Sequence, residues 1–144
     1  MVKRYKVSKR VIPRAIEEIL SLLDSPNAIF LLEGDLASGK TTFVKEFVKY
    51  FDIDDEVTSP TFSIQHIYGT NIYHYDIYQK NLTYFIQSGL FSMLSENGFH
   101  LIEWGDEELA KLLTQYDFKF YHLKISHQSD EKFRIYQVSD KWQS

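Results

Sequence analysis

Gly34-Asp35-Leu36-Ala37-Ser38-Gly39-Lys40-Thr41 satisfies the phosphate-loop pattern G-x-x-x-x-G-K-[ST] in full. The two glycines let the backbone wrap closely enough for successive N–H groups to point at phosphate oxygens. A helix that begins near Thr41 adds the positive end of its dipole. Lys40 is expected to reach the β- and γ-phosphates, and the Thr41 hydroxyl to take a position on Mg²⁺. The stretch therefore predicts a nucleotide loop.

The flanking segments provide the context that this motif requires. Residues 28–32 (Ala-Ile-Phe-Leu-Leu) form a continuous apolar run, typical of a strand that is buried on both faces. From about Thr41 to Phe51, apolar residues recur at helical spacing at Val44, Phe47 and Val48. We expect Lys40 to be exposed to ligand, so that Lys40→Ala abolishes productive ATP binding or turnover and leaves the fold intact.

The rest of the chain alternates helical and strand patterns, with no internal repeat and no low-complexity linker. The expected elements are an edge strand at 6–8, a helix that Pro13 opens and 24–27 end, paired strands at 62–68 and 71–78, a helical stretch at 82–94 interrupted at Gly89, a strand at 99–104, a helix at 106–113, and strands at 118–125 and 133–138. This order predicts one α/β domain over residues 1–144, a P-loop NTPase with a central mixed β-sheet flanked by helices.

Composition excludes several classes of protein. The 144 residues are 44% hydrophobic and 25% charged, an ordinary globular balance that argues against disorder. Cysteine is absent, which excludes a disulfide framework, a thiolate metal site and a cysteine nucleophile. With 16 Lys and Arg against 20 Asp and Glu, autonomous nucleic-acid binding is not expected. No apolar run reaches membrane length, so a cytoplasmic protein is expected.

The aromatic content is high, with 10 Tyr and 11 Phe. A small domain that carries a flexible nucleotide loop has reason to fill a thin core with large side chains. Some tyrosines, such as Tyr68, Tyr73 and Tyr78, are instead expected to face a partner, because Tyr is favoured at interfaces.

Two carboxylates stand at the ends of predicted strands, where ligands of α/β sheets bind. Asp76 ends one strand and Glu103 ends another. Phosphoryl transfer needs such groups to hold Mg²⁺ or to orient the attacking water. The acidic run at 52–56 is instead typical of a solvated loop. His74 is expected to be packed or hydrogen-bonded rather than a base, and the other histidines lack metal-ligand spacing.

Two nucleotide-binding classes are poorly supported. The GTPase motifs Asn-Lys-x-Asp and Asp-x-x-Gly do not occur in the chain. Small-molecule kinases clamp the transferred phosphate with several arginines, whereas no arginine lies between Arg14 and Arg134.

Four motifs of the chain resemble, in order and spacing, those of the bacterial TsaE (YjeE) ATPases. They are the loop with its continuation Thr42-Phe43, Ser59-Pro60-Thr61-Phe62, His74-Tyr75-Asp76-Ile77-Tyr78 and Ile102-Glu103-Trp104. The resemblance runs from about Ala28 to Asp106, and Gly89 also matches a family glycine. It implies an ATPase that uses ATP and Mg²⁺ and supports threonylcarbamoyl-adenosine modification of tRNAs that read codons beginning with A. The implied partners are TsaD, the transferase, and TsaB, its scaffold, with tRNA reached indirectly through the complex.

The resemblance also implies roles for single residues. Asp76 and Glu103 look like the family's metal-binding and catalytic carboxylates, and Trp104 looks like the tryptophan beside its site. The segment 59–62 looks like the switch loop, in which Thr61 senses the γ-phosphate or Mg²⁺. The expected site comprises Lys40, Asp76 and Glu103 for catalysis, Thr41, Asp76 and Glu103 for the metal, and Gly34, Ala37, Ser38, Gly39, Lys40, Thr41, Thr42, Thr61 and Trp104 for the nucleotide.

The chain departs from the family pattern at two places. The family usually has Gly-Ala where this chain has Ala37-Ser38, so one loop position is expected to accept a Cβ without strain. The common Tyr-Arg pair is here Tyr78-Gln79, which puts any ionic role of that arginine in doubt. Hydrolysis is expected to be slow without partners. Two other hypotheses stay open: an ATP-gated assembly module without significant hydrolysis of its own, and a small-metabolite kinase.

Overall fold

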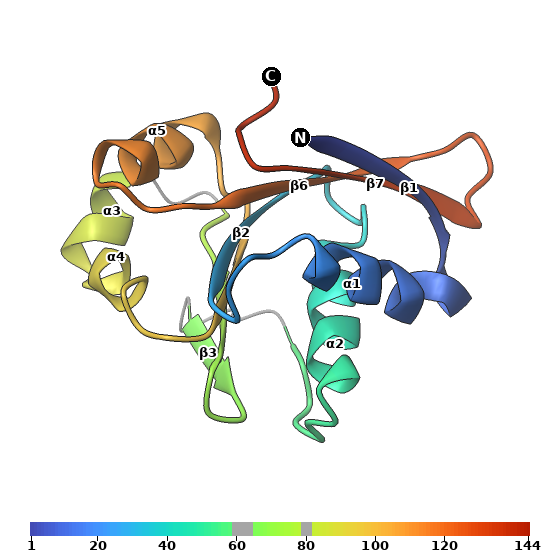
Figure 1. Cartoon of the computed structure of the whole chain (residues 1–144), viewed down its shortest axis with the longest axis horizontal. Helices are drawn as coiled ribbons and strands as arrows, with labels where there is room; N and C mark the ends of the chain where they lie inside the picture. The colour runs from blue at the N-terminus through green and yellow to red at the C-terminus, as the bar shows by residue number, and fades with distance from the viewer. Residues whose placement is uncertain (59–64, 79–81) are drawn as a thin grey trace.

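Within residues 1–58, 65–78 and 82–144, which a computed structural model of the chain describes, seven strands form one sheet with helices on both faces (Figure 1). The elements in chain order are β1 (Val2–Ser8), the 3₁₀ helix η1 (Lys9–Val11), α1 (Ile12–Ser21), β2 (Ala28–Glu33), α2 (Lys40–Tyr50), β3 (Gln65–Tyr68), β4 (Ile72–Asp76), α3 (Leu82–Gln87), α4 (Leu90–Met93), β5 (Phe99–Glu103), α5 (Glu107–Gln115), β6 (Tyr121–His127) and β7 (Phe133–Ser139).

The strand order is β1-β7-β6-β2-β5-β4-β3, and the sheet is mixed. The central strand β2 runs parallel to β5 and β6, and β5 runs parallel to β4. Antiparallel pairs complete both sides, β3 with β4 on one and β6, β7 and β1 on the other. The predicted α/β fold with a mixed central sheet is confirmed.

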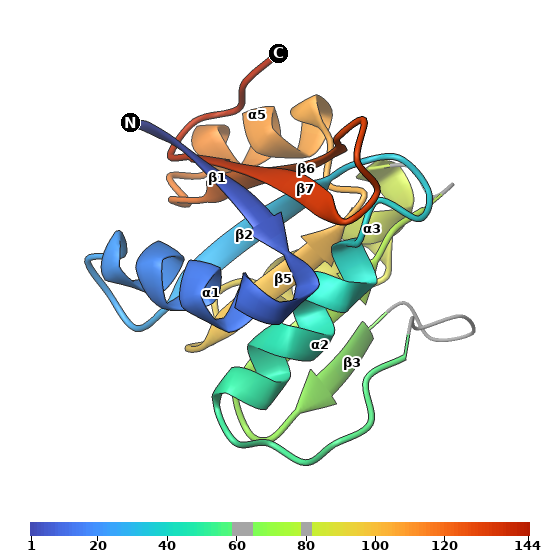
Figure 2. The same cartoon turned by 90° about the vertical axis from the view of Figure 1, so that its right-hand side faces the viewer.

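Side chains of the central strand alternate between two apolar layers, which explains its continuous run of apolar residues. Phe30 and Leu32 pack toward α1 and α2, whereas Ile29 and Leu31 pack toward α3, α4 and α5. Phe47 of α2 lies edge-on to Phe30, with ring centroids 6.2 Å apart. Figure 2 shows α1 and α2 together on the first of these faces. Much of the aromatic content is therefore core, as expected.

Most predicted elements are found close to their expected bounds. The helix after the loop begins at Lys40, the hairpin turns at Gly69 and Thr70, and the helical stretch at 82–94 is broken at Gly89, whose φ is +84°. The edge strand is longer than expected, because residues from Val2 onward pair with β7. The expected strand residues 62–64 lie outside the described part of the chain.

The expectation that three tyrosines face a partner is wrong for two of them. Tyr68 and Tyr73 are buried, one in each layer, whereas Tyr78 is exposed. Tyr73 lies on β4, most of whose residues are buried, and Tyr68 points to the covered face of the edge strand β3, whose other face exposes Ile67. In the described part of the chain, no helix has the length and apolar character needed to cross a membrane.

Candidate functional site

The loop between β2 and α2 is folded tightly against the sheet. A Cβ at Gly34 would lie 2.7 Å from the carbonyl oxygen of Ile125 and would also collide with Ser38 Oγ. Gly39 forms the N-cap of α2 with φ +112°, a conformation that L side chains rarely adopt. The two glycines of the motif are therefore required by the local geometry, as predicted. Helix α2 begins at Lys40, directly after Gly39, so the N-terminus of this helix faces the loop.

Ala37 occupies the left-handed region, with φ +61°. This contradicts the expectation that the loop accepts a Cβ here without strain, because left-handed backbone costs an L-residue about 1–2 kcal/mol. The glycine that the family usually has at this place would adopt the same angle freely.

Lys40 lines the pocket described below, but its side chain is only 4% exposed to solvent. Its Nζ donates hydrogen bonds to the carbonyl oxygens of Gly34, at 2.6 Å, and Asp35, at 3.0 Å. The same nitrogen lies 3.8 Å from the centre of the Trp104 ring, within the range of a cation–π contact. Burial lowers the pKa of the Lys40 amine, against the opposing effect of Glu103 and Asp76.

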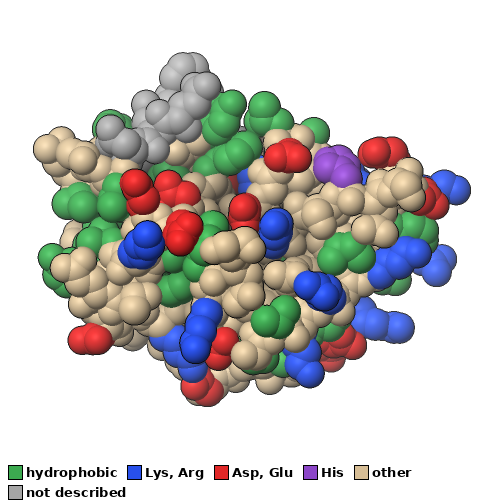
Figure 3. Space-filling view, turned by 90° about the horizontal axis from the view of Figure 1, so that it is seen from above, with side chains coloured by type: hydrophobic (Ala, Val, Ile, Leu, Met, Phe, Trp, Pro, Cys, Tyr) green, Lys and Arg blue, Asp and Glu red, His purple; other side chains and the backbone are tan. Residues whose placement is uncertain are grey.

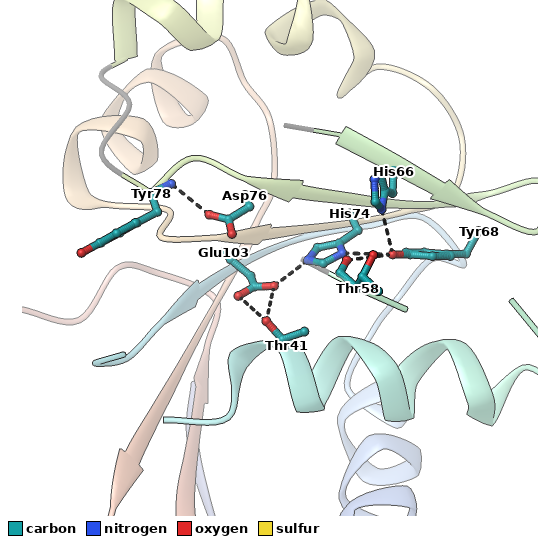
Figure 4. A network of polar contacts seen from close by, with 8 residues as sticks. All are labelled: Thr41, Thr58, His66, Tyr68, His74, Asp76, Tyr78 and Glu103. Atoms are coloured by element: carbon teal, nitrogen blue, oxygen red, sulfur yellow. Dashed lines mark hydrogen bonds and ion pairs between the residues drawn. The ribbon is translucent and has the colours of Figure 1, made fainter. Parts of the chain in front are cut away.

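The two predicted carboxylates meet at one edge of the sheet. Asp76 ends β4 and Glu103 ends β5, and the two residues are direct partners in the parallel ladder. The Thr41 hydroxyl donates toward both Glu103 oxygens, each at 3.0 Å. The backbone N–H of Tyr78 donates to Asp76 Oδ1 at 3.0 Å (Figure 4). The strand ends therefore bring Asp76 and Glu103 to the first turn of α2.

Trp104 turns the chain out of β5 with φ +68°. Such a conformation in a bulky residue stores about 1–3 kcal/mol of strain and occurs mostly at functional sites. The backbone N–H of Trp104 donates to the carbonyl oxygen of Leu32 at 3.0 Å. The indole ring packs on the ring of Tyr78, with centroids 4.5 Å apart. The strained turn places the indole beside the loop lysine.

These residues enclose a pocket of about 360 Å³. Its lining is Leu36, Ala37, Ser38, Gly39, Lys40, Thr41, Thr42, Asp76, Tyr78, Glu103 and Trp104. Of the predicted site residues, Gly34 is not part of this lining and lines a neighbouring pocket instead, and Thr61, like Gln79, falls outside the described residues. All the others line one pocket.

The oxygen donors of the pocket fit Mg²⁺, which is held by one or two carboxylates together with substrate phosphates and water. Thr41, Asp76 and Glu103 provide one hydroxyl and two carboxylates. In the described residues, no cluster of three or more His, Cys, Asp or Glu forms an all-protein cage for a metal. The donor set therefore matches a cation that arrives with phosphate oxygens.

A histidine links Glu103 to the interior of the protein. His74 Nε2 lies 2.6 Å from Glu103 Oε2, and its Nδ1 lies 3.5 Å from the Tyr68 hydroxyl. That hydroxyl donates to the carbonyl oxygen of Thr58 at 3.3 Å (Figure 4). His74 is thus hydrogen-bonded, as predicted, but its partner Glu103 was not foreseen.

Arg134 is a second residue that sequence reasoning missed. It lies at the start of β7, and its Nε donates to the carbonyl oxygen of Ser38 at 2.9 Å. In Figure 2 the β6–β7 hairpin lies beside the loop that precedes α2. Arg134 and Ser38 both line a second pocket, and Arg134 is not among the lining of the first, so it supports the loop from outside the first pocket. No signal in the sequence connects the two residues.

The strand–loop–helix unit and the strand-end carboxylates together define a P-loop NTPase fold. The family model "Threonylcarbamoyl adenosine biosynthesis protein TsaE" matches residues 8–135, and the chain belongs to this family.

Relatives and a solved structure agree with this assignment. The TsaE protein of Rickettsia typhi is 44% identical over 94 residues, which are 62% of this chain and 64% of that protein. The TsaE protein of Treponema pallidum is 35% identical over 109 residues, 74% of each chain. The match thus spans less than two thirds of the Rickettsia relative. The crystal structure of YdiB from Bacillus subtilis superposes with a TM-score of 0.67 and 26% identity, covering 99% of this chain and 88% of that one.

Proposed function

We propose that this protein binds ATP with Mg²⁺ in the 360 Å³ pocket, hydrolyses it slowly, and supports threonylcarbamoyladenosine modification of tRNA through a complex with TsaB and TsaD. One observation carries the proposal: the phosphate loop, Thr41 and both strand-end carboxylates line the same pocket. The matched relatives are named tRNA threonylcarbamoyladenosine biosynthesis protein TsaE, which supports the role in tRNA modification. A cytoplasmic location is part of the proposal, because it is consistent with that role.

The residues of the pocket divide the work of phosphoryl transfer. Backbone N–H groups of the loop and the N-terminus of α2 bind phosphate oxygens. Lys40 moves its amine from the loop carbonyls to the β- and γ-phosphates. Thr41, Asp76 and Glu103 would hold Mg²⁺, and one of the two carboxylates would orient the attacking water. When bound, Mg²⁺ neutralises the charge that develops on the phosphates.

The charge balance supports contact with tRNA through partners rather than by this chain alone. The net charge of −4 does not favour autonomous binding of a polyanion. On the face shown in Figure 3, Lys and Arg side chains are more numerous toward the right of the view, and Asp and Glu side chains lie among them.

A second candidate function is an ATP-gated assembly module in which bound nucleotide, rather than hydrolysis, controls association. The observation in its favour is that none of the described side chains lining the pocket is an arginine. Arg134 is bonded to the outer side of the loop instead. An arginine supplied in trans accelerates hydrolysis about 10³- to 10⁵-fold in known cases. A partner that supplies this charge would turn the module into an ATPase.

Calorimetric titration separates these functions. Purified chain is titrated with ATP, ADP and GTP in Mg²⁺, with and without TsaB and TsaD from the same source, and phosphate release is measured in parallel. We expect ATP to bind, phosphate release to rise with the partners, and Glu103→Gln to abolish the release. Lys45→Ala, on the exposed side of α2, is the matched control for Lys40→Ala.

Three outcomes would each overturn a different part. No phosphate release with partners present, and no effect of Glu103→Gln, excludes the ATPase. Equal partner affinity without nucleotide, with ADP and with an ATP analogue excludes the assembly module. Unchanged threonylcarbamoyladenosine in tRNA, measured by mass spectrometry after removal of this protein from a reconstituted modification reaction, excludes the role in tRNA modification.

A further inference from the structure

A chain of hydrogen bonds extends from the pocket into the protein on the face of the sheet that α2 covers (Figure 4). It runs from Thr41 through Glu103 and His74 to Tyr68 and the carbonyl of Thr58. Glu103 is 3% exposed and His74 is completely buried. The roles proposed above use the first two residues and leave His74 unexplained.

The sheet register places His74 against Glu103. In the parallel pairing of β4 with β5, Asp76 stands opposite Glu103 and His74 stands opposite Leu101. Because side chains alternate along a strand, His74 and Asp76 share the face to which Glu103 points. The backbone ladder of two buried strands, rather than a loop, therefore sets the position of the imidazole.

The Thr41 hydroxyl does not determine which way the carboxylate of Glu103 turns. It has a single proton and lies 3.0 Å from both carboxylate oxygens. His74 does distinguish them, since its Nε2 lies 2.6 Å from Oε2. A short hydrogen bond to a charged acceptor is stronger than a neutral one. The carboxylate is buried and therefore needs such a donor.

We propose that His74 is the positioning residue that fixes the Glu103 carboxylate against Thr41 for catalysis. The inference rests on the proposed ATPase function and names a residue on which that function depends. His74 touches neither nucleotide nor metal and acts only through Glu103. Without its N–H, the carboxylate rotates about its side-chain bonds, and a misplacement of about 1 Å at a reacting centre costs about 100-fold in rate.

The test compares His74→Leu, which removes the donor, with His74→Gln, which keeps a side-chain N–H of similar reach. The control is His100→Leu. His100 is buried on the strand that carries Glu103, and its ring bonds to Tyr75 on the opposite face of the sheet. For each variant, kcat and KM for ATP are measured with the partners, ATP affinity by calorimetry, and stability by urea unfolding.

We expect His74→Leu to lower kcat about 10- to 100-fold with little change in ATP affinity, and His74→Gln to restore most of kcat. His100→Leu is expected to lower stability and leave kcat unchanged. Wild-type kcat in His74→Leu, or equal losses in the Gln and Leu variants, would overturn the proposal. If His74→Leu does not fold, His74→Asn replaces it, because its shorter amide does not reach Glu103.

A readout that does not depend on activity separates this inference from the function on which it rests. In ¹⁵N NMR of the wild-type chain, the His74 Nε2–H is expected to be protected from exchange and to change its chemical shift in Glu103→Gln. A rapidly exchanging Nε2–H, or an unchanged shift, would overturn the positioning role whatever the turnover. Absence of wild-type turnover with a protected Nε2–H would overturn the ATPase function and confirm the contact.

Discussion

Replacing Lys40 by methionine tests whether hydrogen bonding or desolvation dominates the contribution of this lysine to stability. The substitution removes the amine and keeps an unbranched side chain. Two hydrogen bonds to carbonyl oxygens are lost, and bonds to charged groups are each worth about 1.5–3 kcal/mol. Against this loss stands the desolvation of a cation that is 4% exposed, which costs several kcal/mol. The lowered pKa of Lys40 indicates that desolvation outweighs the attraction of the nearby carboxylates.

The freed carbonyls can also be solvated, since Gly34 is half-buried and Asp35 is exposed. We therefore expect Lys40→Met to reduce the free energy of unfolding by no more than about 1 kcal/mol, or to raise it, while ATP binding is lost. Urea unfolding followed by circular dichroism measures this, with Lys45→Met as the exposed control on the same helix. A loss of about 3 kcal/mol or more would refute the reasoning, because the hydrogen bonds would then outweigh desolvation.

The pH dependence of the same pair of proteins gives an independent check. Burial lowers the folded-state pKa of Lys40 below 10.5, so in the window below that value the unfolded chain holds a proton that the folded chain has released. Stability rises with pH wherever the unfolded chain binds more protons. The wild type is therefore expected to gain stability relative to Lys40→Met as pH rises through this window. A constant difference would contradict the lowered pKa.

Three further predictions concern stability. Burial lowers the pKa of His100, whose neutral ring accepts a hydrogen bond from the Tyr75 hydroxyl, so the free energy of unfolding is expected to fall as pH falls below 6.5. His100→Phe should reduce this pH dependence in urea unfolding. An unchanged dependence of stability on pH would contradict the prediction. Ala37→Gly relieves about 1–2 kcal/mol of left-handed strain, and the greater freedom of glycine in the unfolded chain offsets about 0.4–1 kcal/mol of it, so thermal unfolding should show a net gain of up to about 1.6 kcal/mol rather than a loss. Asp106 caps α5 by accepting the N–H of Leu109 at 2.9 Å; Asp106→Ala should cost about 0.5–2 kcal/mol in denaturant unfolding, Asp106→Ser much less, and equal losses would argue against the cap.

Features that depend on residues close together in the sequence could be predicted from the sequence. The phosphate loop, the buried strand before it and the amphipathic helix after it are each local patterns, and all three occur where expected. The carboxylates Asp76 and Glu103 could be placed because strand ends of a parallel sheet share one edge. The hairpin at Gly69 followed from its turn residues.

Features that depend on register between distant segments could not be predicted. The contact of His74 with Glu103 follows from the pairing of β4 with β5, which composition does not specify. Arg134 and Ser38 are 96 residues apart in the sequence. They meet because β7 lies antiparallel beside β6. The burial of Lys40 depends on the turn at Trp104, which places the indole ring over the lysine amine. A tryptophan in the sequence does not indicate a backbone with positive φ.

The pairing of β1 with β7 has a consequence for how the protein is made. Val2 pairs with Ser139 and Ser8 with Phe133, so the earliest of the seven described strands to be synthesised pairs with the latest of them. Until more than 120 further residues have been synthesised, β1 has no strand beside it, and contacts of such long range slow folding. The segment carries the charged side chains Lys3, Arg4 and Lys6. Charged side chains disfavour pairing of an unpaired strand with a non-native strand. This edge of the sheet is therefore expected to close only after β7 has been synthesised, late in the assembly of the described sheet.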